Sequence, residues 1–220
     1  MNIDPDQEYY LKKEIVKGAK AVFHKGLVDI AEGNVSIRIP NRDELFITPT
    51  FNQYGSMNEE DVVHLKFDGT QLSEGKSAST EYRLHVVIYR ARPKAQCVIH
   101  THSTYATILS ITRKKIPIIM EEMIVLLGGE VNISEFGLAH TESIGENVIK
   151  ALGKTNAALL ANHGVLVTGR NMDHTIKIAE LVEKMANIYW GALQIGEPIS
   201  VPDESYSKFI DDFNSNFSTI

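Results

Sequence analysis

The amino-acid sequence predicts a single α/β domain whose sheet is not wholly parallel. Segments with strand-like alternation and segments with helical spacing follow one another along the chain. Several neighbouring strand segments are joined by short turns, as in β-hairpins, and hairpins pair their strands antiparallel. No linker, low-complexity stretch or internal repeat divides the chain, so residues 1–220 are expected to form one domain.

The composition is that of an ordinary globular protein. Of its 220 residues 43% are hydrophobic and 23% are charged, and a chain of this length can bury a sizeable core. The net charge of −6 argues against a general nucleic-acid or anionic-membrane surface. A single cysteine, Cys97, excludes an intrachain disulfide and suits a reducing cytoplasm. The polar N-terminus predicts no signal peptide, and no apolar stretch is long enough to predict a membrane-spanning helix.

The first half of the chain is expected to hold two helices and two hairpins. Apolar residues recur at helical spacing over about residues 5–27. The alternation in "NVSIRI", the turn "PNRDE" and the return "LFIT" predict the first hairpin. A second hairpin, "VVHLKFDGTQL", would turn at Asp68-Gly69. From 79 to 90 the spacing is helical again, with Ser79 or Thr80 as the expected N-cap.

The second half is expected to continue with strands and helices. "AQCVIHTH" predicts a buried strand, and "STYATILSI" predicts a helix directly after it. "AALLANHGVLVTG" predicts two strands around a turn, and a longer helix is expected over about 172–194. The tail from Pro198 has only weak patterning, and no element is predicted there.

Two histidines, His100 and His102, end the predicted strand in "CVIHTHSTYAT". Residues i and i+2 of a strand point to the same face, so both imidazoles can reach one ion. His163, at the turn in "LLANHGV", is the best candidate for a third ligand. Three imidazoles with one open position are typical of a catalytic zinc site. Taken alone, His-x-His is equally compatible with ordinary core or surface histidines.

Other polar residues near predicted element boundaries allow two interpretations each. Glu81 lies in the first turn of a predicted helix, where it is either a solvated acidic residue or a carboxylate that binds a metal or acts as a base beside it. "EGNVS" and "SAST" are either ordinary turn and cap sequences or a cradle of N–H groups and hydroxyls for an anion.

The ordered set of motifs resembles the class II aldolase/adducin family. The motifs are "GNVS", "ITPT", "GK-x-x-STE-x-x-LH", "IYRARP", "VIHTHSTYAT" and "LLANHGV", and the resemblance covers about Ile15 to Tyr189. It implies a three-layer α/β/α fold around a mostly antiparallel sheet, and a homotetramer with active sites at the subunit interfaces. It also implies a zinc-dependent aldolase in the cytoplasm, closest in motifs to the members that cleave L-fuculose 1-phosphate.

The resemblance also implies roles for individual residues. His100, His102 and His163 match the zinc-binding histidines, and Glu81 matches a glutamate that binds the resting metal and moves a proton. The residues that match the phosphate-binding positions are Gly33, Asn34, Thr50, Ser79 and Thr80. The implied reaction cleaves a ketose 1-phosphate to dihydroxyacetone phosphate and a lactaldehyde-like aldehyde.

Three alternatives remain open from the sequence. The same metal core serves sugar-phosphate 4-epimerases and decarboxylases of 3-oxo-acid phosphates, although the glutamate of "STE" favours the aldolase. A non-enzymatic adducin-like module is the third alternative, and the three intact histidines argue against it. The chain departs from the fuculose-phosphate aldolase pattern at Phe51-Asn52, at Glu121 and Glu122, and in a tail (about 198–220) that is expected to help complete the active site.

Overall fold

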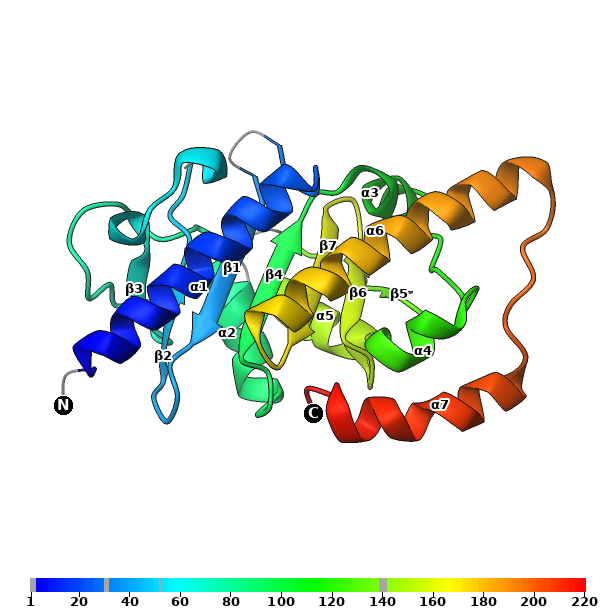
Figure 1. Cartoon of the computed structure of the whole chain (residues 1–220). Coiled ribbons are helices and arrows are strands. Elements are labelled where there is room, and N and C mark those ends of the chain that lie inside the picture. The colour runs from blue at the N-terminus through cyan, green and yellow to red at the C-terminus, as the bar shows by residue number, and fades with distance from the viewer. Residues whose placement is uncertain (1–2, 30–31, 52, 139–141) are drawn as a thin grey trace.

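The computed structural model describes residues 3–29, 32–51, 53–138 and 142–220. Seven strands form one sheet in the order β3-β2-β1-β4-β7-β6-β5 (Figure 1). The strands are β1 (Asn34–Arg38), β2 (Glu44–Ile47), β3 (Val63–Lys66), β4 (Cys97–Thr101), β5 (Asn132–Ile133), β6 (Ala157–Leu160) and β7 (Gly164–Gly169). Among these strands only β5 and β6 pair in parallel, so the sheet is mostly antiparallel, as predicted.

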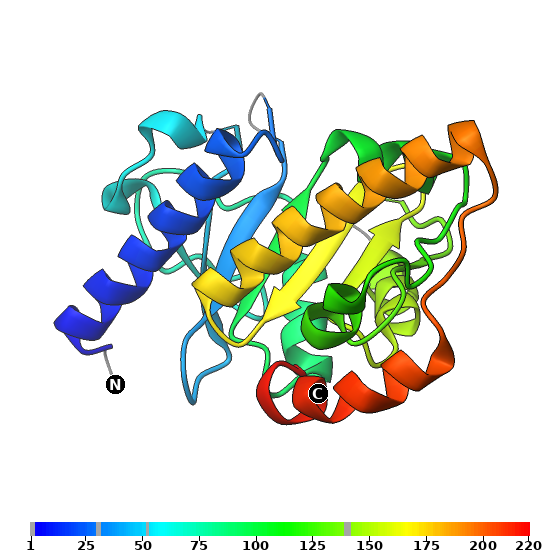
Figure 2. The same ribbon diagram turned by 45° about the vertical axis from the view of Figure 1, so that its right-hand side comes forward.

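Helices cover both faces of the sheet, which gives the three layers expected from the resemblance (Figures 1 and 2). One face carries α1 (Pro5–His24), α3 (Thr104–Ile111) and α6 (Met172–Ile195), and the other carries α2 (Tyr82–Ala91) and α5 (Glu142–Leu152). Two 3₁₀ turns, Tyr54–Ser56 and Glu59–Asp61, pack beside α1. Side chains alternate along the strands, so each face has its own apolar core cluster.

Most of the expected elements are present, with two corrections in the first half. The second hairpin does turn at Asp68-Gly69, but its return is only an isolated bridge between Leu65 and Gln71. Neither Ser79 nor Thr80 is the N-cap of α2, since the helix begins at Tyr82 with Glu81 in the capping position. Ser79 instead accepts a hydrogen bond from the backbone N–H of Glu81 at 3.3 Å.

The C-terminal tail forms a helix that was not predicted, α7 (Asp203–Asn216), which packs against α4 (Glu121–Leu127). The last residues are tied to the domain by buried polar contacts. Arg92 donates to the carbonyl of Thr155 and the hydroxyl of Thr219, and Asn156 donates to the carbonyl of Phe217. Arg92 follows the end of α2 and Asn156 precedes the start of β6, whereas Glu81 and His163 lie at the opposite ends of these elements. Within this chain α7 and the residues after it therefore lie away from the histidines (Figure 1).

Candidate metal centre

Three histidines lie together at one end of the central strands, because β4 ends and β7 begins there. His100 lies in β4, and His102 follows two residues later on the same side. Antiparallel pairing places Thr101 opposite Val165, so the turn between β6 and β7 lies beside the end of β4. His163 occupies that turn, next to Asn162, whose φ of 54° is in the left-handed region that asparagine tolerates.

The three imidazoles converge closely. Their ring centroids lie 4.6–4.9 Å apart, and one ligand nitrogen from each ring lies within 4.8 Å of the others. His100 is fully buried, while His102 and His163 are partly exposed. Burial lowers the pKa of His100 to about 3 and also lowers the pKa of His102, so both rings are neutral at pH 7. Neutral imidazole is the form that binds a metal ion.

In His100 and His102 the hydrogen bond made by Nδ1 determines that Nε2 carries the lone pair. His100 Nδ1 lies 2.9 Å from the carbonyl oxygen of Val165 and therefore carries the hydrogen. His102 Nδ1 lies 3.3 Å from a carboxylate oxygen of Glu32 and does the same. The two Nε2 atoms, 3.0 Å apart, then face each other with lone pairs. A cation between them removes this repulsion, so the residues fit a bound divalent metal.

Glu81 completes the group from the start of α2. Its Oε1 lies 3.1 Å from His163 Nε2, and its Oε2 lies 3.6 Å from His100 Nε2 and 2.7 Å from the amide nitrogen of Asn34. Burial on its own would raise the pKa of the Glu81 carboxyl, but the surrounding His100, His163 and Asn34 outweigh burial and hold this pKa below its usual range. Glu81 is therefore an anion that faces the three histidines.

The expected phosphate-binding residues come from three segments that lie side by side. Thr48 is paired with Val35 by backbone and side-chain hydrogen bonds, and its carbonyl accepts from the N–H of Ser79 at 3.1 Å. Thr50 donates its N–H to the carbonyl of Ser77 at 3.0 Å. Gly33 and Asn34 precede Val35, and Thr80 follows Ser79, so all five residues belong to one neighbourhood beside Glu81. The Asn34 side chain, however, is already engaged by Glu81 and His85.

The departures from the expected pattern lie outside the histidine group. Phe51 is 87% exposed and has a φ of 51°, while Asn52 lies outside the described residues. Glu121 accepts a hydrogen bond from Ser205, and Glu122 forms an ion pair with Lys184, both on the surface of this chain.

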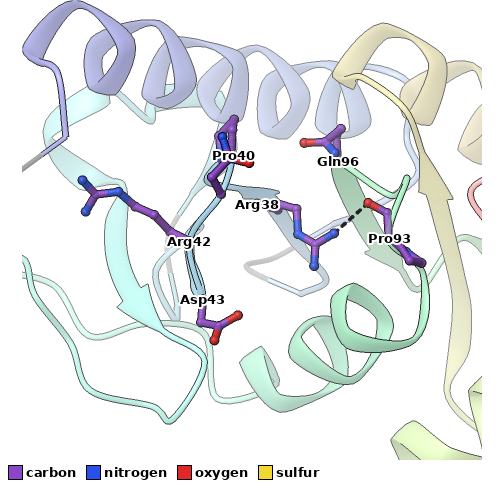
Figure 3. A pocket seen from close by; sticks show the side chains of 7 residues that line it. Arg38, Pro40, Arg42, Asp43, Pro93 and Gln96 are labelled. Carbon is purple, nitrogen blue, oxygen red and sulfur yellow. Dashed lines mark hydrogen bonds between the residues drawn. The ribbon is translucent and has the colours of Figure 1, made fainter. Parts of the chain in front are cut away.

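A separate pocket of about 440 Å³ lies at the other end of β1 and β4 (Figure 3). Its lining residues are Arg38, Pro40, Asn41, Arg42, Asp43, Pro93 and Gln96. The Arg38 guanidinium donates to the carbonyls of Pro93 and Tyr89 and lies over the Tyr89 ring, so it ties β1 to the end of α2. None of the candidate catalytic, metal-binding or phosphate-binding residues lines this pocket.

Two carboxylates near the histidines were missed in the sequence. Glu32 contacts His102, although "EGNVS" was considered only for its backbone and small polar groups. Glu183 accepts the N–H groups of Tyr105 and Ala106 at 2.9 and 3.0 Å and so caps α3, whose own N-cap Ser103 makes no capping bond. Glu183 is 78 and 77 residues away from Tyr105 and Ala106 in the sequence, so no local pattern indicates these two hydrogen bonds.

Known proteins are similar to this chain in sequence and in overall fold. Residues 13–190 match the family model described as class II aldolase and adducin N-terminal domain. The chain belongs to the class II aldolase and adducin family. Its strands, its helix order and the convergence of His100, His102 and His163 agree with that assignment.

Individual relatives extend over nearly the whole chain. A 5-methylthioribulose-1-phosphate/5-deoxyribulose-1-phosphate aldolase of Rhodospirillum rubrum is 31% identical over 96% of this chain and 94% of its own length. The L-fuculose phosphate aldolase of Escherichia coli is 30% identical over 93% of this chain and 94% of its own. A solved L-fuculose 1-phosphate aldolase superposes with a TM-score of 0.88 at 30% identity, covering 96% and 98% of the two chains.

Because the chain belongs to this family and brings His100, His102 and His163 together, it is a metal-dependent lyase. Within the described residues, no helix is both long enough and apolar enough to cross a membrane.

Proposed function

We propose that the protein is a zinc-dependent aldolase that cleaves a ketose 1-phosphate to dihydroxyacetone phosphate and an aldehyde. The observation that carries the proposal is the group of His100, His102, His163 and Glu81, with four ligand-type side chains around one point. Metal sites with three imidazoles and an exchangeable fourth position are typical of catalysis rather than of structure.

We assign the three histidine Nε2 atoms and a Glu81 oxygen to one zinc ion in the resting protein. His100 and His102 are oriented for this role by Val165 and Glu32, which hold their outer nitrogens. When bound, zinc supplies Lewis-acid stabilisation of the negative charge that develops on the substrate oxygens as the carbon–carbon bond breaks.

Glu81 is proposed to move the proton on carbon. In the direction of condensation its carboxylate removes a proton from the hydroxymethyl carbon of dihydroxyacetone phosphate, and that carbon then bonds to the aldehyde carbonyl carbon. In the direction of cleavage Glu81 returns a proton to the same carbon. The low pKa of Glu81 keeps it ionised at pH 7, and Asn34 holds one of its oxygens at 2.7 Å.

The substrate phosphate is assigned to Gly33, Thr50, Ser79 and Thr80, with the second amide hydrogen of Asn34 as a further donor. Ser79 and Thr80 directly precede Glu81, so a phosphate held there would keep the reacting carbons near the carboxylate. Binding energy from this unreactive group would meet the cost of orienting the substrate.

Two substrate classes are proposed for the aldehyde half. The first is an L-fuculose-1-phosphate-like ketose that gives a lactaldehyde-like product, supported by the 30% identical fuculose phosphate aldolases. The second is a 5-deoxy or 5-methylthio ribulose 1-phosphate, supported by the similarly close relative from Rhodospirillum rubrum.

The test measures release of dihydroxyacetone phosphate from these three ketose 1-phosphates by coupled reduction to glycerol 3-phosphate. Zinc-loaded protein should be active, chelated protein inactive, and added zinc should restore activity. His163→Ala should abolish cleavage, whereas the surface histidine variant His24→Ala should not. A zinc-replete protein that releases no dihydroxyacetone phosphate from any of them would refute the aldolase. NMR analysis of the products formed from a pentulose phosphate and from a 3-oxo-acid phosphate would then test for an epimer and for loss of carbon dioxide.

We also propose that the protein is a cytoplasmic homotetramer whose sites lie between subunits and are completed in part by the tail of about 198–220. Four large apolar side chains near the end of α6 and just after it are exposed, namely Ile188, Trp190, Ile195 and Ile199. Apolar groups exposed in this way favour contact with another subunit. Light scattering of the eluted protein gives the mass, and a monomer at micromolar concentration would refute the tetramer.

A further inference from the structure

A row of polar side chains is buried between β1 and α2, on the face of the sheet opposite α1. Asn34 and Ser36 come from β1, and His85 and Tyr89 come from α2. Each of the four is at most 1% exposed. Buried polar groups require partners, so this row calls for an explanation that ordinary core packing does not give.

The row exists because the strand and the helix have nearly equal repeats. Asn34, Ser36 and Arg38 lie at every second residue of β1, and alternate strand residues are about 6.6–6.8 Å apart on one face. Glu81, His85 and Tyr89 lie at every fourth residue, about 6 Å apart along a helix. The two sets therefore stay opposite one another along the contact between β1 and α2.

The side chains form a continuous series of hydrogen bonds that ends at Glu81. Asn34 Nδ2 lies 2.7 Å from Glu81 Oε2, and Asn34 Oδ1 contacts His85 Nε2. On the other side of the ring, His85 Nδ1 lies 2.6 Å from the hydroxyl of Ser36. That hydroxyl lies 2.7 Å from the hydroxyl of Tyr89.

The first two donors follow from the carboxylate. An ionised carboxylate only accepts hydrogen bonds, so the amide NH₂ of Asn34 must face Glu81. The amide oxygen then faces His85 and only accepts, so the Nε2 atom of His85 must carry a hydrogen.

The remaining donors follow from the neutral ring. Burial lowers the pKa of His85 to about 4, so at pH 7 the ring has one hydrogen, already placed on Nε2. His85 Nδ1 therefore accepts the hydrogen of the Ser36 hydroxyl. Ser36 then accepts from Tyr89, whose pKa is raised by burial, so that its phenol keeps its hydrogen.

We infer that Tyr89, Ser36, His85 and Asn34 form a one-directional chain of hydrogen-bond donors that fixes the Glu81 carboxylate in the metal centre, with His85 held as its Nε2–H tautomer. His85 is thus a positioning residue that acts through Asn34, and it does not bind the metal itself. Donors that all point the same way polarise one another, so the last one, the Asn34 amide, is strengthened where it meets Glu81.

This inference rests on the proposed role of Glu81, but its tests use no substrate, so failure of the aldolase assay leaves them intact. Nitrogen-15 NMR of histidine-labelled protein distinguishes a protonated from an unprotonated ring nitrogen, and the His85 signal is assigned from its loss in His85→Gln. We expect an Nε2–H ring with an unprotonated Nδ1 at pH 7. An Nδ1–H tautomer or a doubly protonated ring would overturn the chain.

Zinc affinity, measured by competition with a chelating dye, tests whether the chain acts on the metal centre. Substitution of residues that orient a metal ligand typically lowers metal affinity by about 10–100-fold, so His85→Leu should bind zinc more weakly by about that factor. His85→Gln keeps a donor toward Asn34 and should recover most of the loss. Ser36→Ala should weaken zinc binding by about tenfold, which is the lower end of the same range.

The matched control is Ser110→Ala, because Ser110 is an equally buried serine in α3 that donates to the carbonyl of Thr107 and takes no part in the series of hydrogen bonds from Tyr89 to Glu81. Urea unfolding of each variant without metal reports the general loss of stability. If Ser36→Ala and Ser110→Ala bind zinc as tightly as each other, or if His85→Gln is no better than His85→Leu, the chain does not position Glu81.

Discussion

Replacing Glu183 by alanine should destabilise the protein and loosen the segment that follows His102. The Glu183 carboxylate on α6 accepts the N–H groups of Tyr105 and Ala106, at 2.9 and 3.0 Å. Ser103, the N-cap residue of α3, makes no capping bond and so offers no substitute. Loss of a helix cap costs about 0.5–2 kcal/mol, and loss of a negative charge at a helix N-terminus costs about 0.3–1 kcal/mol. The sum is about 2 kcal/mol for Glu183→Ala.

The assay is urea unfolding of the chelated protein at one fixed concentration, with Glu180→Ala as the control. Glu180 lies nearly one turn earlier on the same helix and forms an exposed ion pair with Lys25 at 2.8 Å, which is worth at most about 1 kcal/mol. In a thermal melt of the same samples, a loss of about 2 kcal/mol corresponds to a fall in Tm of roughly 4–8 °C for a domain of this size. Glu183→Gln keeps an acceptor oxygen and should lose about half as much. If Glu183→Ala is no less stable than Glu180→Ala, the carboxylate is not a cap.

Three further predictions concern the metal ligand, acid stability and the C-terminal helix. Glu32→Gln removes the carboxylate from His102 Nδ1 and should weaken zinc binding by about tenfold in a dye competition, whereas an unchanged affinity would show that Glu32 does not orient the ring. Burial lowers the pKa of His174 to about 4, so between about pH 6.5 and 4 the unfolded protein binds a proton that the folded protein does not, and the free energy of unfolding falls as pH falls. In urea unfolding of the chelated protein at pH 7 and pH 5, His174→Gln should lose less stability between the two pH values than the parent protein. An equal loss in both proteins would contradict the prediction. Gly128→Ala should lower the free energy of unfolding more than Gly75→Ala does. Both glycines have a positive φ, but only a Cβ at position 128 meets the Phe213 ring of α7. Equal losses would mean that the packing of α7 tolerates the added methyl group.

The histidine group was predictable because its members are set by local features of strands. His100 and His102 share a strand direction, so the strand repeat brings these two together, and the hairpin of β6 and β7 places His163 at a turn. Family resemblance supplied the link between His163 and the other two, which spacing alone left open. Glu81 was placed correctly at the start of α2, even though the expected N-caps Ser79 and Thr80 were not.

The polar face of β1 was not understood from the sequence, although its alternation was visible. Alternation of Val35 and Ile37 with Asn34 and Ser36 ordinarily indicates one buried and one solvated face. Here both faces are buried, because α2 covers the polar one and supplies His85 and Tyr89 as partners. Which polar strand residues are buried depends on a helix about 50 residues away, and no local pattern contains that information.

Helix α7 was missed for a different reason. Tyr206, Phe209, Ile210 and Phe213 are spaced three or four residues apart, which is a helical pattern, but polar residues dominate the rest of the tail. Only Phe213 among them is buried in the structure, against Gly128 at the end of α4. A single anchor of this kind, together with the hydrogen bonds of Arg92 and Asn156, stabilises a helix that propensity alone does not predict.

The sequence indicates the residues of the candidate metal centre, but it does not indicate which residues select the substrate. The three histidines and Glu81 lie at strand ends and at a helix start, where packing holds their backbone, while the side chains of His102 and His163 remain 27% and 19% exposed. Residues that would choose the aldehyde must face that open side. In this chain Phe51 points to solvent, Glu121 and Glu122 contact Ser205 and Lys184, and the end of the tail is held at the remote edge of the sheet. Selection of the aldehyde is therefore expected to depend on side chains brought to the opening by a neighbouring subunit of the proposed tetramer, so the oligomeric state and the substrate have to be determined together.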